Sequence, residues 1–216
     1  MKIKIENLTK EFKDSLILND INLEFQEGKV YGLVGPNGSG KSVLLKIICA
    51  FYMPTKGKVL IDGVNYNDGN NFPPNLRALI DKPSFIPDLS GFENLKLLAN
   101  IQNLINDDDI INTLKIVNLY EEKDKKFYKY SMGMKQKLGI ASVLMEKPKI
   151  MILDEPFNGI DDESKSKLFE YLAKIKKNKI IIISSHIFEE IQKVCDEVYY
   201  FENGTCVKKW VLLKKI

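Results

Sequence analysis

The feature that most constrains this chain is a glycine-rich stretch over residues 35–42, which reads G-P-N-G-S-G-K-S. Its spacing is G-x-x-x-x-G-K-[ST]. An apolar run over residues 29–34 precedes it, and a segment without helix breakers over residues 43–49 follows it. A strand, a glycine loop and a helix in this order are the context that a phosphate-binding loop requires. The sequence therefore predicts a P-loop within an α/β fold.

The residue types in this loop suit a polyphosphate. Glycines let the backbone wrap closely around phosphate oxygens, and successive N–H groups then form an anion nest at the positive end of a helix. Lys41 is expected to reach the β- and γ-phosphates, and the hydroxyl of Ser42 to hold Mg²⁺. The alternative is a chance glycine turn, which the flanking strand and helix disfavour. The expected nucleotide contacts are Gly35, Pro36, Asn37, Gly38, Ser39, Gly40, Lys41 and Ser42.

Composition limits the partners of the protein. The chain has 216 residues and a net charge of only +3, so we expect no nucleic-acid partner, which usually requires a concentrated basic face. Its three cysteines are widely spaced and show no metal or disulfide spacing, which favours reduced thiols in the cytosol. No apolar run is long enough to cross a bilayer, so work at a membrane would need another chain to supply the span.

Apolar patterning divides the chain into strands and helices. Alternating runs near the N-terminus predict antiparallel strands, and continuous apolar runs farther on predict a parallel sheet. A helix is expected from about Ser164, a loop around Phe12 and over 65–75, and a hairpin over 198–210. The expected strands cover residues 3–8, 21–25, 29–34, 58–61, 76–80, 149–153 and 179–183.

The middle of the chain has a different, helical pattern. Ser90 begins a capping box, and Asp107 and Ser131 are candidate N-caps of two further helices. We therefore expect a helical subdomain over 84–146, inserted into a core made of 1–83 and 147–216. The expected fold class is α/β: a P-loop NTPase core with a mainly parallel sheet, N-terminal antiparallel strands and this inserted subdomain.

Polar residues follow several of the expected parallel strands. Asp154 and Glu155 come directly after one apolar run, and His186, the only histidine, follows another. Parallel sheets bind ligands beyond the carboxyl ends of their strands, where the glycine loop also lies. These side chains are therefore expected to converge with the P-loop in one site.

On these segments the sequence resembles the nucleotide-binding domain of ABC transporters, over nearly the whole chain. Residues 150–155 are similar to the Walker B motif, which implies that Asp154 enters the magnesium shell and that Glu155 polarises the attacking water. His186 takes the place of the family's switch histidine, which would contact the γ-phosphate. An acidic turn and a structural histidine are the alternatives.

The assignments of four further residues depend on the resemblance. Residues 130–134 take the place of the signature L-S-G-G-Q: Ser131 and Gly133 match it, and methionines replace the other glycine and the glutamine. The resemblance implies that Ser131 and Gly133 bind the γ-phosphate of a second copy; a plain N-cap is the alternative. Phe12 corresponds to the aromatic residue that stacks on adenine, or else is a core residue. Asp81 replaces the family's Q-loop glutamine and is expected to serve Mg²⁺, unless it has no role.

The resemblance implies an ATP- and Mg²⁺-dependent ATPase subunit that powers an ABC transporter. The departures at Asp81 and in the signature resemble the bacterial drug- and peptide-export or self-immunity subgroup, which implies an exporter of drugs, peptides or lipids. The implied partners are a separate transmembrane permease subunit and a second nucleotide-binding subunit, identical or paralogous. The implied location is cytoplasmic, on the inner face of the membrane through the permease.

Other functions remain open from the sequence. One is a soluble ABC-type ATPase, for example in iron–sulfur cluster assembly; others are a P-loop small-molecule kinase and a binding module that hydrolyses ATP poorly. A permease contact is expected over residues 81–95, where Phe85, Ile86 and Phe92 are either exposed or buried in the helical subdomain.

Overall fold

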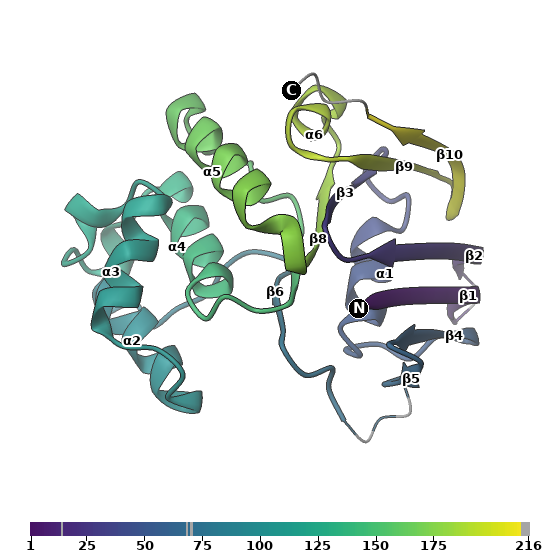
Figure 1. Cartoon of the computed structure of the whole chain (residues 1–216), viewed down its shortest axis with the longest axis horizontal. Coiled ribbons are helices and arrows are strands. Elements are labelled where there is room, and N and C mark those ends of the chain that lie inside the picture. Colours follow the sequence, from purple (N-terminus) through teal and green to yellow (C-terminus); the bar gives the residue numbers. More distant parts are fainter. Residues whose placement is uncertain (14, 68, 70, 213–216) are drawn as a thin grey trace.

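The strands form two sheets that enclose one helix (Figure 1). The structure, a computed structural model, describes residues 1–13, 15–67, 69 and 71–212. Within these residues the smaller sheet has the order β2-β1-β4-β5, and all its pairs are antiparallel. Its strands are β1 (Lys2–Phe12), β2 (Ser15–Gln26), β4 (Lys56–Ile61) and β5 (Val64–Asn65).

The larger sheet has the order β10-β9-β3-β8-β7-β6 within the described residues. Its neighbours are parallel except β9 and β10, which form the hairpin that the sequence predicted. Strands β7 and β8 are buried along their whole length, as expected for continuous apolar runs covered on both faces. The strands are β3 (Lys29–Val34), β6 (Leu76–Leu79), β7 (Ile150–Leu153), β8 (Ile180–Ser185), β9 (Glu197–Glu202) and β10 (Thr205–Val211).

Helix α1 (Lys41–Ile48) lies between the two sheets. Its Leu44, Leu45 and Ile47 are fully buried in one core that includes residues of β1 and β2 on one side and of β3, β7 and β8 on the other. This burial fixes the helix that follows the glycine loop, so the start of α1 is held at the edge of the larger sheet.

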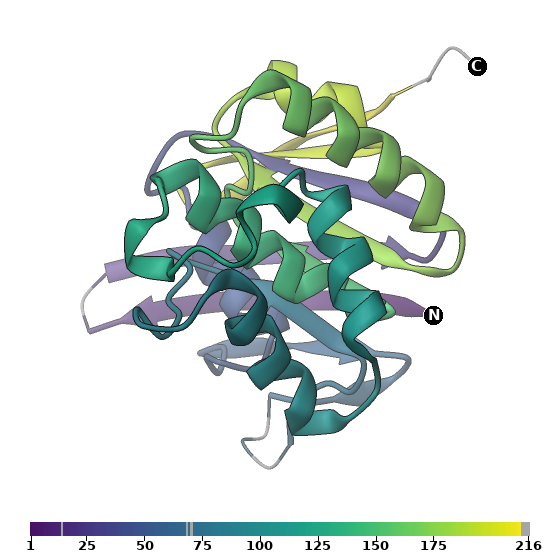
Figure 2. The same ribbon diagram turned by 90° about the vertical axis from the view of Figure 1, so that its left-hand side faces the viewer.

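The remaining helices cover the opposite face of the larger sheet (Figure 2). They share a second core with the residues of β7 and β8 that point to this face. The α-helices are α2 (Gly91–Gln102), α3 (Asp107–Ile116), α4 (Met132–Leu144), α5 (Asp162–Ile175) and α6 (Phe188–Val194). Of these, α2 and α3 extend farthest from the larger sheet (Figure 1). Short 3-10 helices cover Tyr120–Glu122, Phe127–Lys129 and Lys176–Asn178.

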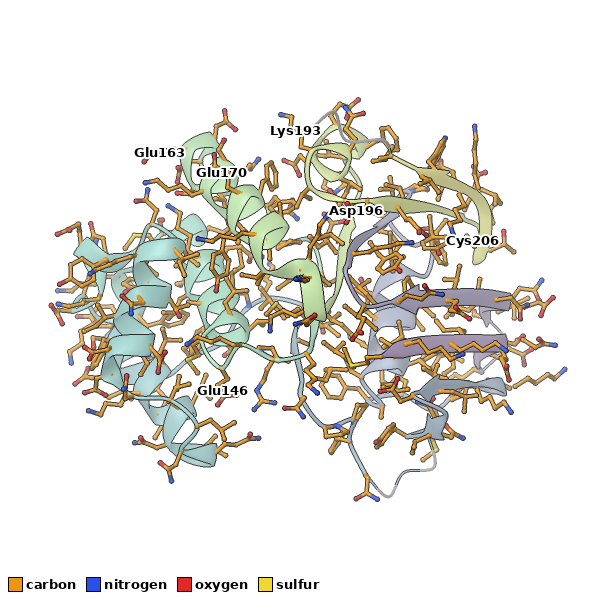
Figure 3. All side chains as sticks on the ribbon, in the orientation of Figure 1. Glu146, Glu163, Glu170, Lys193, Asp196 and Cys206 are labelled. Atoms are coloured by element: carbon orange, nitrogen blue, oxygen red, sulfur yellow. The ribbon has the colours of Figure 1, made fainter. Side chains whose placement is uncertain are left out.

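Helix α4 joins the helical region to the sheet. Beyond its end, the Glu146 side chain (labelled in Figure 3) is 5% exposed and pairs with Arg77 of β6. Buried Leu138 and Ala141 of α4 belong to the same core as Leu95 of α2. The division into a core of 1–83 and 147–216 and a helical subdomain of 84–146 stays a prediction.

The expected fold class is confirmed, with local corrections. Phe12 ends strand β1 and does not lie in a loop, because β1 and β2 pair up to Phe12 and Ser15. The N-cap of α3 is Asn106, whose side chain accepts the Asp109 N–H, and not Asp107. Helix α5 begins at Asp162, capped by Asp161. The short strand β5 enters the region expected to be a loop, and part of that region lies outside the described residues.

The capping predictions for the other two helices are confirmed. Ser90 and Glu93 form the capping box of α2, and Ser131 caps α4 by accepting the Met134 N–H. Among the described residues, no helix is both long and apolar enough to span a membrane.

Candidate functional site

The P-loop turns sharply between β3 and α1 and lines a cavity of about 340 Å³. Gly40 has φ +97°, and a Cβ there would lie 2.6 Å from Leu18 Cδ2. At Gly35 a Cβ would lie only 2.1 Å from the Phe201 carbonyl oxygen. Glycine is therefore required at both positions, as a loop that folds its backbone around a ligand needs. The cavity is lined by Ile17, Asn37, Gly38, Ser39, Gly40, Lys41, Ser42, Val43 and Glu155.

Two polar side chains of the loop fit a bound anion. Lys41 is 6% exposed, and its Nζ donates to the carbonyl oxygens of Gly35 at 2.7 Å and Pro36 at 3.1 Å. Burial lowers the pKa of Lys41, against the opposing influence of Glu155 and Asp154. The buried Ser39 hydroxyl has no hydrogen-bond partner within the described chain. A phosphate oxygen would pair with these groups and offset the desolvation of the ammonium.

Strands β7 and β8 deliver the acidic residues and the histidine to the same edge. Asp154 is 7% exposed, and its Oδ1 accepts a hydrogen bond from the Ser184 hydroxyl. Glu155 lines the cavity, and its Oε2 lies 2.9 Å from His186 Nδ1. The structure thus brings Asp154, Glu155, His186 and the P-loop together, as expected from their positions after parallel strands.

The oxygen donors suit Mg²⁺. The Ser42 hydroxyl lies at the start of α1, and Asp154 exerts its charge on the neighbouring Lys41. Within the described residues, no three His, Cys, Asp or Glu side chains form a metal site by themselves. A cation between Ser42 and Asp154 would therefore take its other ligands from phosphate and water, which is how Mg²⁺ is commonly held in nucleotide sites.

Asp81 has a partner that the sequence did not reveal. Its Oδ2 lies 2.8 Å from Lys46 Nζ of α1, its side chain is 66% exposed, and its backbone has φ +63°. The Asp81 carboxylate is therefore ion-paired with Lys46 in the present structure. A role of Asp81 in holding Mg²⁺ stays a prediction and would require it to exchange partners.

Phe12 is a surface residue rather than a core one. It is 39% exposed, its ring packs edge-on against Tyr52 with centroids 5.4 Å apart, and Lys10 Nζ lies 4.5 Å from its centroid. The core alternative is therefore excluded. An exposed ring at the end of β1 is available for stacking on a base, which stays a prediction for this residue.

The N-terminus of α4 lies outside the P-loop cavity. Ser131 is exposed, and neither Ser131 nor Gly133 lines that cavity. Gly133 packs closely on the segment after Glu155, since a Cβ at this position would lie 2.3 Å from the Gly159 carbonyl oxygen. Any phosphate bound by this helix start would have to come from outside this cavity.

Sequence reasoning missed the residues that support this site. Gln136 Nε2 donates to the Glu155 carbonyl oxygen at 3.2 Å, and Lys137 Nζ pairs with Asp161 at 2.7 Å. Ser184 contacts both Asp154 and Glu155. The one available signal for Ser184 was its place at the end of an apolar strand, two residues before His186.

The surface expected to meet a permease is mixed. Phe85 and Phe92 are half-buried and pack against the core of the helical region, with Phe85 5.3 Å from the Phe127 ring centroid. Ile86 is 45% exposed. The two phenylalanines therefore follow the buried alternative, and only Ile86 of the three is open to solvent.

Comparison with known proteins agrees with this geometry. A family profile described as "ABC transporter" matches residues 18–158. The bacitracin transport ATP-binding protein BcrA of Enterococcus faecalis is 37% identical over 210 residues, which cover 96% of this chain and 68% of that protein. The lantibiotic transport ATP-binding protein SrtF of Streptococcus pyogenes is 33% identical over 206 residues, which cover 95% of this chain and 89% of the relative.

Solved structures show the same fold. A dimeric ATP-binding cassette in a post-hydrolysis state, bound to ADP and phosphate, superposes with a TM-score of 0.86 at 25% identity and covers 99% of this chain and 100% of its own. An ATP-binding subunit of an ABC transporter superposes with a TM-score of 0.88 at 26% identity, over 98% of this chain and 90% of its own. The chain therefore belongs to the ABC transporter family, as one of its ATP-binding and ATP-hydrolysing subunits.

Proposed function

We propose that this subunit powers the export of peptide antibiotics or related compounds through a separate membrane permease. The support comes from relatives whose names refer to bacitracin and lantibiotic transport, at 37% and 33% identity over nearly the whole chain. Departures from the usual family pattern at Asp81, Met132 and Met134 accompany that similarity.

The structural observation that supports a paired ATP site is the division of the proposed phosphate-binding groups between two places. The P-loop, Asp154, Glu155 and His186 gather at one cavity edge, whereas Ser131 and Gly133 lie outside that cavity. Two copies, or one copy and a paralogue, complete each other when Ser131 and Gly133 of one chain close over the nucleotide of its neighbour. A solved relative that is dimeric with ADP and phosphate supports this arrangement.

The chemistry assigned to the site is phosphoryl transfer to water, which depends on positioning and charge stabilisation. Lys41 and the loop N–H groups bind the β- and γ-phosphates. Ser42 and Asp154 would hold Mg²⁺, whose positive charge would offset negative charge on the phosphates. Glu155 accepts the proton of the attacking water, and the 2.9 Å contact with His186 Nδ1 keeps its carboxylate oriented.

The proposed permease contact is the surface formed by the residues that follow α1 and by residues 81–86. Phe51 and Phe72 are 56% and 69% exposed, with ring centroids 6.1 Å apart, and Ile86 is 45% exposed. Lys46 lies beside this surface, because it pairs with Asp81 and its Nζ lies 5.7 Å from the Tyr52 ring centroid. Through such a contact the protein would be held at the inner face of the membrane.

The test of the catalytic assignment is Glu155→Gln. We expect turnover to fall by at least about 100-fold, because general-base catalysis contributes roughly 10²–10⁴-fold, while ATP binding is retained and an ATP-bound dimer accumulates. Phosphate release and size-exclusion chromatography measure both effects. Glu170→Gln, on the exposed side of α5, is the matched control (Figure 3). Unchanged turnover in Glu155→Gln would refute the water-activation role.

The partner is tested separately by co-purifying the native complex from membranes and identifying the other subunits. We expect a permease in the complex. Recovery of the chain with an iron–sulfur assembly machinery, and with no membrane subunit, would favour the soluble ATPase alternative.

A further inference from the structure

Ser184 is a fully buried hydroxyl that touches two residues of the proposed catalytic centre. It lies near the end of β8, its exposed fraction is 0%, and the ladder between β7 and β8 places it beside the end of β7. Its Oγ donates to Asp154 Oδ1 and accepts the backbone N–H of Glu155 at 2.9 Å. One hydroxyl therefore uses its proton on one residue and a lone pair on the next.

These two hydrogen bonds restrict the Asp154 carboxylate and the Glu155 backbone. The hydrogen bond from Ser184 orients the Asp154 carboxylate, which is the group that would bind a cation. This bond occupies one of the two carboxylate oxygens, Oδ1. The bond to the N–H of Glu155 supports a backbone with φ +47°, a left-handed conformation that is strained for a non-glycine residue. Such strain persists only where surrounding contacts determine the geometry.

Other elements hold the remaining polar groups of Glu155. Its carbonyl oxygen accepts from Gln136 Nε2 of α4 at 3.2 Å, and its carboxylate contacts His186 Nδ1. Ser184 and His186 are two residues apart at the end of β8, so this strand end contacts Glu155 at both its backbone and its side chain. The Glu155 carbonyl oxygen also accepts the Asn158 N–H at 3.4 Å. Among these hydrogen-bond partners of Glu155 in the described chain, only Ser184 also bonds to Asp154.

We infer that Ser184 is a positioning residue for ATP hydrolysis: it sets the orientation of the Asp154 carboxylate relative to the Glu155 side chain. The inference rests on the proposed roles of Asp154 and Glu155. Partners of metal ligands typically change metal affinity or activity by 10- to 100-fold when they are removed. A merely structural hydroxyl would instead affect stability and leave the hydrolytic step alone.

The experiment compares Ser184→Ala with the parent chain in the presence of its purified membrane partner or as the isolated subunit, whichever hydrolyses ATP. We expect kcat to fall by about tenfold or more and the Mg²⁺ concentration for half-maximal activity to rise several-fold, with KM for ATP changed less than about twofold. Fluorescent ATP titrations without Mg²⁺ should match the parent, whereas the gain in affinity on adding Mg²⁺ should shrink.

Two further variants separate the hydroxyl from its surroundings. Ser184→Cys keeps the shape of the side chain but supplies only a weak donor, so it should show the same loss of kcat and the same change in Mg²⁺ dependence. It therefore tests the inference if the alanine variant does not fold. Ser185→Ala removes a neighbouring buried hydroxyl, whose Oγ accepts the Ile187 N–H at 3.0 Å, and should keep parental kcat and Mg²⁺ dependence.

The outcomes are distinct from those for the proposed function. If Glu155→Gln abolishes turnover while Ser184→Ala and Ser184→Cys keep parental kcat and Mg²⁺ dependence, the positioning role is wrong and the catalytic assignment stands. A lower melting temperature in Ser184→Ala with unchanged kcat would likewise overturn the inference. If Glu155→Gln hydrolyses ATP normally, the proposed water-activation role of Glu155 fails.

Discussion

The starts of α1 and α4 are both candidate phosphate sites, and they differ in almost every respect. The α1 start is preceded by Gly40 in a left-handed conformation, has no side-chain cap, and opens on a cavity with a buried lysine. The α4 start is capped by Ser131, which accepts the Met134 N–H at 3.2 Å, and it is exposed. Free N–H groups at a helix start attract anions in both places.

The difference shows what one chain can complete by itself. At α1 the glycines, Lys41 and Ser39 are arranged for a ligand before it arrives, because the two sheets enclose the helix. At α4 the cap is a stable arrangement by itself, and the capping Ser131 is exposed, although Gly133 packs on Gly159. The first helix start therefore suits primary nucleotide binding, and the second suits contact with a nucleotide held by another chain.

The largest expected effect concerns the α1 site. Lys41→Ala removes the one ammonium that the described residues contribute to the cavity lining. It should lower turnover by about 100- to 1000-fold, comparable to the loss of a strong transition-state donor. ATP affinity should fall as well, measured by fluorescent nucleotide titration. If Lys41→Ala keeps turnover within threefold of the parent, the buried lysine has no role in phosphate binding. The proposed difference between the starts of α1 and α4 would then be wrong.

A smaller effect is expected at α4, with a matched control. Ser131→Ala and Ser90→Ala both remove an N-cap, which costs about 1 kcal/mol of unfolding free energy in each case. Only Ser131→Ala should lower turnover, by about tenfold or more, and it should leave ATP binding by the isolated chain unchanged. Equal turnover in the two variants would reduce Ser131 to a plain cap, which is the alternative that the sequence left open.

The smallest expected effect is on stability and concerns the ion pair between Lys137 of α4 and Asp161, the N-cap of α5. The ion pair with Lys137, followed by the hydrogen bond from the Ser164 N–H, holds the pKa of Asp161 well below its usual range. A lowered folded-state pKa means that the stabilisation is present above the unfolded pKa of about 4 and is lost as the pH falls through the folded pKa. Asp161→Asn should therefore lower the unfolding free energy by less than about 1 kcal/mol at pH 7, since the side chain is 53% exposed.

Urea unfolding of the parent and Asp161→Asn between pH 7 and pH 3 measures this dependence. The difference between the two proteins should shrink toward the acid end. Glu163→Gln, which removes the exposed pair with Lys167, is the control and should have a smaller effect at every pH. A difference for Asp161→Asn that stays constant across the range would show that the ion pair with Lys137 is not its cause.

Several parts of the site could be predicted because they are local. The glycine spacing of residues 35–42, the acidic pair after β7 and the serine caps of α2 and α4 each depend on neighbours within a few residues. The α3 cap was placed one residue too late, because Asn106 and Asp107 both suit a helix start and only the backbone decides between them.

Other parts depended on contacts between distant segments. The pairing of Asp81 with Lys46 joins residues 35 positions apart, and Ser184 contacts Asp154 from 30 positions away. The sequence patterns around these residues do not predict either contact. Phe12 likewise lies in a polar stretch of the sequence, and the pairing of β1 with β2 made it the end of a strand.

The sequence by itself determined the residue types at the nucleotide site and the order of strands and helices, because local backbone preferences and apolar spacing specify them. Tertiary structure alone decided how Glu155 is oriented, which partner Asp81 takes, and that Ser131 lies outside the P-loop cavity. Packing of the parallel strands sets these relations, since it brings together side chains whose separation in the sequence carries no information about their distance.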